Sequence, residues 1–190
     1  YVFTKISGLP ENQIMGSGTI LDTARLRYGL SEHFQVAQGN IHAYVFGEHG
    51  DTSFIPWTGA YISGLSTDEY YEEMKAHGKD VKPLDKEAML EYVQKSGGKV
   101  IAKKGATFYA VSATVCQLVG LILAASDSLA TVSSMLHGEY GIEDVCLSTL
   151  TLVGPNGIQG KVQMRMNKEE VELLKKSANA LKEVIAQIEL

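Results

Sequence analysis

Two short segments of the sequence carry side chains suited to binding an anion and transferring a proton. The first, Leu21–Arg27, holds Asp22, Arg25 and Arg27. On a helix, Asp22 and Arg25 point within roughly 60° of each other, so they can form an ion pair or face one cleft. Arg27 points roughly 200° away from Arg25 and must serve a different surface. The plain alternative is a solvated helix with a single ion pair.

The second segment, Gly47-Glu48-His49-Gly50-Asp51, places a histidine between two glycines. The glycines allow a sharp turn and leave space beside the imidazole. Histidine titrates near neutrality and therefore suits proton transfer to or from a hydroxyl or carbonyl oxygen. A carboxylate on one ring nitrogen would fix the tautomer and leave the other nitrogen for a substrate. A metal site at Glu48, His49 and Asp51 is disfavoured because neighbouring residues rarely converge on one ion. A purely structural loop histidine stays open.

Hydrophobic periodicity sets these segments in a mixed fold of helices and strand pairs. The first segment lies on a helix expected over residues 21–34. Residues 36–46 hold β-favouring side chains around a turn at Gly39-Asn40, which predicts a hairpin. Strand alternation there would put His42, Tyr44 and Phe46 on one face. Further helices are expected over 1–7, 68–77 and 85–97.

The second half of the chain predicts an uncharged helix, a hairpin and a capped helix. Residues 105–126 carry no charge, but polar side chains dilute their apolar character, which favours a buried core helix over a membrane span. Strands are expected over 146–153 and 158–166, joined through residues 154–157. Asn167 and Glu170 have the spacing of a capping box before an amphipathic helix. Antiparallel strand pairs beside separate helices indicate an α+β fold.

Composition limits the class of protein. The chain has 190 residues, 17 Lys+Arg against 22 Asp+Glu, and a net charge of -5, and its length fits one ordinary domain or two small ones. Its hydrophobic fraction of 45% and charged fraction of 21% are typical of globular proteins and exclude wholesale disorder. The mildly acidic chain lacks basic clusters, which disfavours nucleic acid and anionic membranes as partners. Cys116 and Cys146 are too few for a disulfide scaffold and lack metal-ligand spacing. They predict reduced, buried thiols of a cytoplasmic protein without a metal site.

Residues 16–27 and 47–52, together with Lys104–Ala110, closely resemble the catalytic domain of bacterial NAD-dependent L-lactate dehydrogenases. The resemblance covers essentially the whole chain, so residues 1–190 are expected to form one domain of the lactate/malate dehydrogenase C-terminal type. It implies that His49 is the acid/base for pyruvate and L-lactate, with Asp22 as its carboxylate partner. It further implies that Arg25 grips the substrate carboxylate as a two-pronged fork and that Thr107 lines the pocket.

The same resemblance implies a regulatory site. Arg27 and His42 match positions at which bacterial lactate dehydrogenases bind the activator fructose 1,6-bisphosphate, at an interface between subunits. The family is usually homotetrameric, so a homo-oligomer is expected for the full-length protein. The alternative is a pair of surface cations with no effector.

A nucleotide-binding fingerprint is missing from the sequence. No Gly-x-Gly-x-x-Gly follows a strand, and in the resembling family this motif belongs to an N-terminal Rossmann domain that binds NAD. Tyr1 enters in an apolar-periodic pattern, as if cut within an element. These residues alone are therefore expected to be unable to transfer hydride. Two alternatives stay open: the equivalent domain of a malate dehydrogenase, and a stand-alone, non-catalytic binding domain of the same fold.

Overall fold

The computed structural model describes residues 1–189, which form an α+β fold. The helices are α1 (Val2–Ile6), α2 (Ile20–Phe34), α3 (Thr67–Ala76), α4 (Lys86–Lys104), α5 (Tyr109–Leu123) and α6 (Lys168–Ile185). The strands are β1 (Ile41–His42), β2 (Tyr61–Ile62), β3 (Leu65–Ser66), β4 (Ser128–Ala130), β5 (Ser133–His137), β6 (Glu143–Ser148), β7 (Thr151–Gly154) and β8 (Gly157–Lys161).

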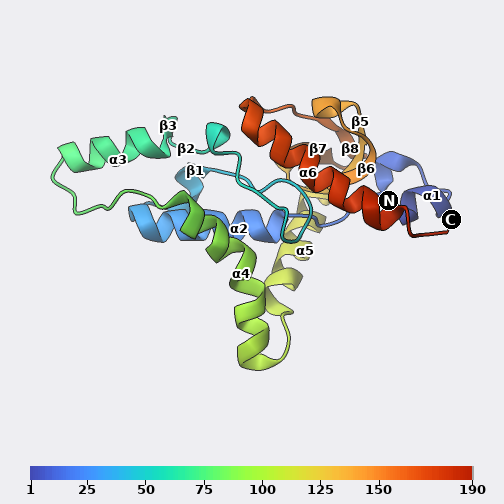
Figure 1. The fold of residues 1–190 in the computed structure, drawn as a ribbon, viewed down its shortest axis with the longest axis horizontal. Helices are drawn as coiled ribbons and strands as arrows, with labels where there is room; N and C mark the ends of the chain where they lie inside the picture. The colour runs from blue at the N-terminus through green and yellow to red at the C-terminus, as the bar shows by residue number, and fades with distance from the viewer. Residues whose placement is uncertain (190) are drawn as a thin grey trace.

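The strands form three small antiparallel sheets, in the orders β1-β2-β3, β4-β7-β8 and β5-β6. Helix α6 lies along the β5-β6 sheet, whereas α2 runs through the middle of the molecule towards β1 (Figure 1). One apolar cluster joins α2, β1, β2 and α4, and a second joins α6 to β5 and β6. Antiparallel sheets with separate helices confirm the α+β prediction.

Helix α2 forms where the apolar periodicity predicts it. Leu26, Leu30 and Phe34 recur every four residues and are buried on one face. Asp22 lies in the first turn, where a negative charge interacts favourably with the helix dipole. The helix ends at Gln35, which adopts a left-handed conformation.

The predicted hairpin over 36–46 is wrong. Gly39 and Asn40 lie in a 3-10 turn, and β1 pairs instead with β2, about twenty residues further along the chain. Alternation holds from Ile41 to Val45, but Phe46 is fully buried rather than sharing the outer face with His42 and Tyr44. The reason is that Phe46 forms an antiparallel bridge with Phe54 and packs into the cluster under α6.

Helix α4 extends seven residues beyond the predicted end at Gly97 and finishes at Lys104. Gly105, with φ +80°, supplies the left-handed residue that ends it. Gly97 lies beside Arg25 instead: a Cβ at Gly97 would be 3.6 Å from the Arg25 guanidinium. The absence of a side chain at Gly97 therefore leaves space on this face of α4 for the Arg25 guanidinium.

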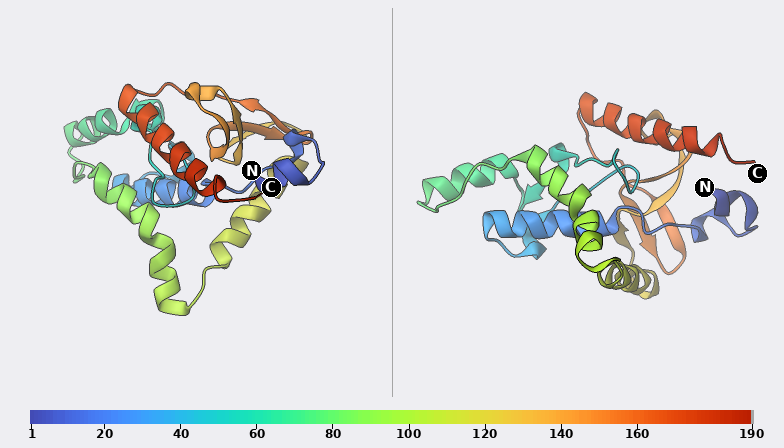
Figure 2. Two further views of the ribbon diagram at one scale, coloured as in Figure 1. Left: turned by 45° about the vertical axis from the view of Figure 1, so that its right-hand side comes forward. Right: turned by 60° about the horizontal axis from the view of Figure 1, so that its bottom comes forward.

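Helix α5 is not the buried core helix that its composition predicts. Only Thr114 and Leu118 are buried in it, and an apolar stripe with Val111, Val115 and Val119 is exposed. Helices α4 and α5 form a V whose tip projects from the rest of the molecule (Figures 1 and 2). Within residues 1–189, no helix combines the length and hydropathy needed to span a membrane.

The prediction of two buried thiols is also wrong. Cys116 lies on the exposed surface of α5, because most of that helix has no packing partner in residues 1–189, and Cys146 on β6 is only half-buried.

The C-terminal elements follow the prediction more closely. β7 and β8 form the expected hairpin, with Gly157 at φ +82°, although β8 ends at Lys161 and residues 146–153 divide into two strands. Asn167 and Glu170 form the capping box at the start of α6. The Glu170 carboxylate also accepts a hydrogen bond from the Thr58 backbone, which ties the start of α6 to the segment before β2.

Candidate active site

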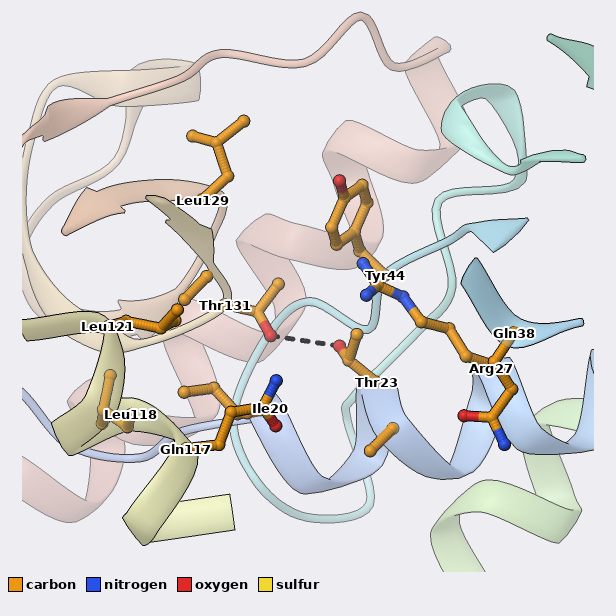
Figure 3. Close-up of a pocket in the computed structure, with 12 residues that line it drawn as sticks. Ile20, Thr23, Arg27, Gln38, Tyr44, Gln117, Leu118, Leu121, Leu129 and Thr131 are labelled. Atoms are coloured by element: carbon orange, nitrogen blue, oxygen red, sulfur yellow. Dashed lines mark hydrogen bonds between the residues drawn. The ribbon is translucent and has the colours of Figure 1, made fainter. Parts of the chain in front are cut away.

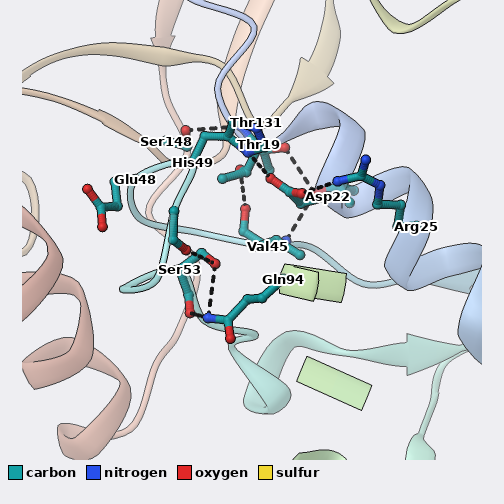
Figure 4. Close-up of polar contacts among 12 residues, drawn as sticks. Thr19, Asp22, Arg25, Val45, Glu48, His49, Ser53, Gln94, Thr131 and Ser148 are labelled. Atoms are coloured by element: carbon teal, nitrogen blue, oxygen red, sulfur yellow. Dashed lines mark hydrogen bonds and ion pairs between the residues drawn. The ribbon is translucent and has the colours of Figure 1, made fainter. Parts of the chain in front are cut away.

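The Asp22 carboxylate joins the two segments that carry the candidate chemistry. Its Oδ1 accepts a hydrogen bond from Arg25 Nη1 at 3.1 Å, and its Oδ2 lies 2.5 Å from His49 Nδ1 (Figure 4). Asp22 is only 4% exposed, so it interacts with both partners away from most of the solvent. Residues 27 positions apart in the sequence thus share one carboxylate.

The electrostatics of His49 follow from this contact. The hydrogen bond to Asp22 raises the pKa of His49 above its ordinary value, and the charge of Asp22 adds to this effect. Partial burial and the positive charge of Arg25 act in the opposite direction. The imidazole side chain is 61% exposed, so its other ring nitrogen is open to a small molecule.

A cleft of about 470 Å³ opens beside these residues. His49 and Arg25 line it together with Thr107, which is half-buried in the segment between α4 and α5. Its other walls come from α2, the His49 loop, α4 and α5: Leu21, Asp22, Gly50, Asp51, Ser53, Gln94, Gly97, Gly98, Ile101 and Val111. A cation and a titratable imidazole therefore face the same space.

Buried hydrogen bonds hold the His49 segment against the start of α2. Thr19 Oγ1 donates to the Val45 carbonyl at 2.5 Å, and the Val45 N–H donates to Thr23 Oγ1 at 3.0 Å. Thr23 also shares a hydrogen bond with Thr131, which ties α2 to the segment after β4 (Figure 3). These threonines fix the backbone at Val45, four residues before His49, and so bring the loop to Asp22.

Arg27 and His42 lie on another surface, as the helix geometry requires. Arg27 Nε donates to the Ala43 carbonyl at 3.1 Å, and its guanidinium lies 5.1 Å from the centre of the Tyr44 ring. Arg27 and Tyr44 border a separate pocket between α2, α5 and β4 (Figure 3). His42 is exposed on β1, and no hydrogen bond joins it to Arg27.

Sequence reasoning missed Gln94. Its side chain reaches from α4 to the His49 loop, where Nε2 donates to the Ser53 carbonyl at 2.9 Å (Figure 4). Nε2 also donates to the Asp51 carbonyl at 3.2 Å. A single glutamine on a half-exposed helix gives no signal of such a contact. In the part of the chain that the structure describes, no three His, Cys, Asp or Glu side chains are grouped to hold a metal ion. The Glu48 carboxylate instead accepts hydrogen bonds from Thr52.

The fold and the site define an α+β domain that pairs an imidazole with a buried carboxylate beside an arginine-lined cleft. Residues 19–189 match the family model described as lactate/malate dehydrogenase, alpha/beta C-terminal domain. The chain belongs to this family.

The relatives are bacterial L-lactate dehydrogenases. The chain is 45% identical to the L-lactate dehydrogenase of Acetivibrio thermocellus. The match includes 100% of this chain and 59% of that protein. The chain is 42% identical to L-lactate dehydrogenase 1 of Clostridium acetobutylicum over 99% of the chain, again covering 59% of the relative. The chain thus spans about three fifths of the length of these relatives.

Solved structures agree with the sequence relatives. The L-lactate dehydrogenase of Clostridium thermocellum superposes with a TM-score of 0.89 at 35% identity, over all of this chain and 61% of its own. A minor L-lactate dehydrogenase from Enterococcus mundtii, solved in a ligand-bound form, gives a TM-score of 0.88 at 29% identity, over 98% of this chain and 58% of its own.

Replacing Asp22 with asparagine should lower the pKa of His49, because the substitution removes the carboxylate that stabilises the imidazolium. Because the pKa of His49 is higher in the folded than in the unfolded chain, its contact with Asp22 stabilises the fold. This stabilisation is complete at a pH below the pKa of His49 in the unfolded chain, and it is lost as the pH rises through the pKa of His49 in the folded chain. An NMR titration of the His49 ring protons measures the shift. Asp51→Asn, two residues from His49, is the matched control and should leave the titration unchanged. Equal titration midpoints in Asp22→Asn and the unsubstituted chain would contradict the assignment.

Proposed function

We propose that this chain supplies the substrate-binding and acid/base half of an L-lactate dehydrogenase, which interconverts pyruvate and L-lactate with NADH and NAD. The observation that carries the proposal is the convergence of His49, Asp22 and Arg25 at one cleft. The L-lactate dehydrogenase relatives, which match over 98–100% of the chain, support the choice of substrate.

Arg25 binds the carboxylate of pyruvate in this proposal. Its guanidinium is planar and carries several N–H donors, so it can give two parallel hydrogen bonds to a carboxylate. Asp22 holds Nη1 on one side, and Gly97 leaves room on the other. The bound carboxylate would direct the keto carbon towards His49, since both residues line the same cleft.

His49 transfers the proton. With Nδ1 held by Asp22, the proton on Nε2 passes to the keto oxygen of pyruvate as a hydride reaches the keto carbon, and the product is a hydroxyl group. In the reverse direction Nε2 takes the hydroxyl proton of lactate. Asp22 stabilises the imidazolium state in both directions. Thr107 closes one side of the substrate space.

NAD supplies or accepts the hydride when bound, and we propose that it is bound mainly by a Rossmann domain outside these residues. The strand pairs between residues 1 and 189 are all antiparallel, whereas a dinucleotide platform needs parallel strands leading into a glycine-rich turn. Only the cleft beside His49 would then approach the nicotinamide.

The rival dehydrogenase is one that acts on malate, since the matched family includes both activities. Turnover of pyruvate against oxaloacetate by the complete enzyme distinguishes the two. A non-catalytic binding domain is disfavoured, because such a domain needs neither a raised pKa on an exposed histidine nor an arginine beside it.

Regulation by fructose 1,6-bisphosphate is a further part of the proposal. Arg27 and His42 lie near each other in the fold, because Arg27 Nε donates a hydrogen bond to the carbonyl of Ala43, the residue after His42. In a homotetramer, such groups from two subunits can surround phosphates, and the activator would favour the arrangement that brings them together. A cytoplasmic location remains a prediction.

Arg25→Lys should raise the KM of the complete enzyme for pyruvate about tenfold or more, because losing one of two charge-assisted hydrogen bonds costs about 1.5–3 kcal/mol. Steady-state kinetics with pyruvate and NADH measure the effect. Arg165→Lys, on an exposed segment, is the control and should keep the original KM. If Arg25→Lys left the KM unchanged, Arg25 would not bind the pyruvate carboxylate through two hydrogen bonds.

His42→Ala should leave turnover without activator intact and weaken activation by fructose 1,6-bisphosphate, since one phosphate-binding cation is removed. The activation constant should also rise with added salt, because charge screening weakens phosphate binding. Activation curves of the complete enzyme provide the measurement, with His77→Ala, at the residue that caps the C-terminal end of α3, as the control. An activation curve identical to that of the unsubstituted enzyme would refute the effector site.

A further inference from the structure

The loop that carries His49 is anchored from behind by a serine on the C-terminal helix. Ser177 is fully buried on α6, beside Leu174 and Ala178 on the apolar stripe of that helix. A serine at such a position lowers helix propensity and buries a polar group, so its hydroxyl needs hydrogen-bond partners. These partners come from the His49 loop.

One hydroxyl serves both sides of the loop. The Glu48 N–H donates to Ser177 Oγ at 2.8 Å, and Ser177 Oγ lies 2.8 Å from Thr52 Oγ1. Thr52 Oγ1 donates in turn to the Glu48 carboxylate at 2.8 Å. Because the Thr52 proton goes to the carboxylate, Ser177 must donate to Thr52, and it therefore acts as acceptor and donor at once. The ring of contacts thus joins Glu48 and Thr52, the residues on either side of the segment that carries His49.

The backbone before His49 is shaped to fit this serine. Gly47 has φ +97°, and a Cβ at Gly47 would come 2.7 Å from Ser177 Oγ. Only glycine allows both this conformation and this approach. On the opposite side, Gln94 of α4 holds the carbonyls of Asp51 and Ser53. Helices α4 and α6 thus hold the loop from two sides, whereas the imidazole itself has one hydrogen-bond partner within residues 1–189, Asp22.

We propose that Ser177 is a positioning residue for His49: by fixing the backbone at Glu48 and Thr52, it holds the imidazole against Asp22 and directs the free ring nitrogen into the cleft. The consequence for activity rests on the proposed dehydrogenase function. The consequence for the state of His49 does not, since it follows from the contact with Asp22 alone. A loosened loop should therefore weaken the His49–Asp22 bond without altering the carboxylate grip at Arg25.

Ser177→Ala should lower the pKa of His49, measured by NMR titration of its ring protons, and reduce kcat for pyruvate in the complete enzyme about tenfold to a hundredfold. The KM for pyruvate should stay near its original value. Thr52→Val breaks the same ring from the other side and should give the same two changes, whereas Thr52→Ser keeps the hydroxyl and should restore them. The effects of Ser177→Ala and Thr52→Val should be less than additive, because they interrupt one network.

Two controls separate positioning from general loss of stability. Ser134→Ala removes another buried serine, on β5, and Asn179→Ala alters an exposed residue on α6; both should leave the pKa of His49 and kcat unchanged. If Ser177→Ala and Thr52→Val behave like these controls, the positioning role is overturned while the dehydrogenase proposal stands. If the pKa falls in both variants but the unsubstituted enzyme does not reduce pyruvate, the positioning role stands and the dehydrogenase proposal fails.

Discussion

The buried carboxylate of Asp22 is the constraint on which the rest of the site depends. One of its oxygens accepts a hydrogen bond from Arg25, the other contacts His49, and almost none of the residue is exposed to solvent. A buried carboxylate needs such partners, because an unpaired charge there would be costly. Satisfying Asp22 therefore brings the cation and the imidazole to one cleft, so the contacts that stabilise this corner of the fold also arrange its candidate chemistry.

Much of the surrounding fold holds the His49 loop in reach of Asp22. Thr19 and Thr23 hold the preceding segment at Val45 against the start of α2, and Gln94 and Ser177 hold the loop itself from α4 and α6. These elements are far apart in the sequence, so the geometry of the site depends on the folded α+β core. The imidazole is then exposed to a substrate while the backbone that carries it is held in place.

Local patterns predicted the parts of the structure that local forces decide. The spacing of Asp22 and Arg25 predicted a shared helix face, and the Asn167–Glu170 pattern predicted the start of α6. Local patterns could not predict contacts between distant segments. The partner of β1 is β2, about twenty residues further along the chain, and α5 is exposed although it is apolar. The pairing of His49 with Asp22 came only from family resemblance. Ser177 did leave a signal, since it is a polar residue on an apolar helical stripe, but the pattern alone cannot name its partner.

Pyruvate-dependent oxidation of NADH by the complete enzyme, with and without His49, tests the central claim most directly. His49→Ala should reduce turnover about 10²–10⁴-fold, the range expected when a general acid is removed, while NADH binding is unchanged. Turnover within a few-fold of the unsubstituted enzyme would show that the proton comes from elsewhere. The arrangement around Asp22 would then be a structural feature of this domain and not its catalytic centre.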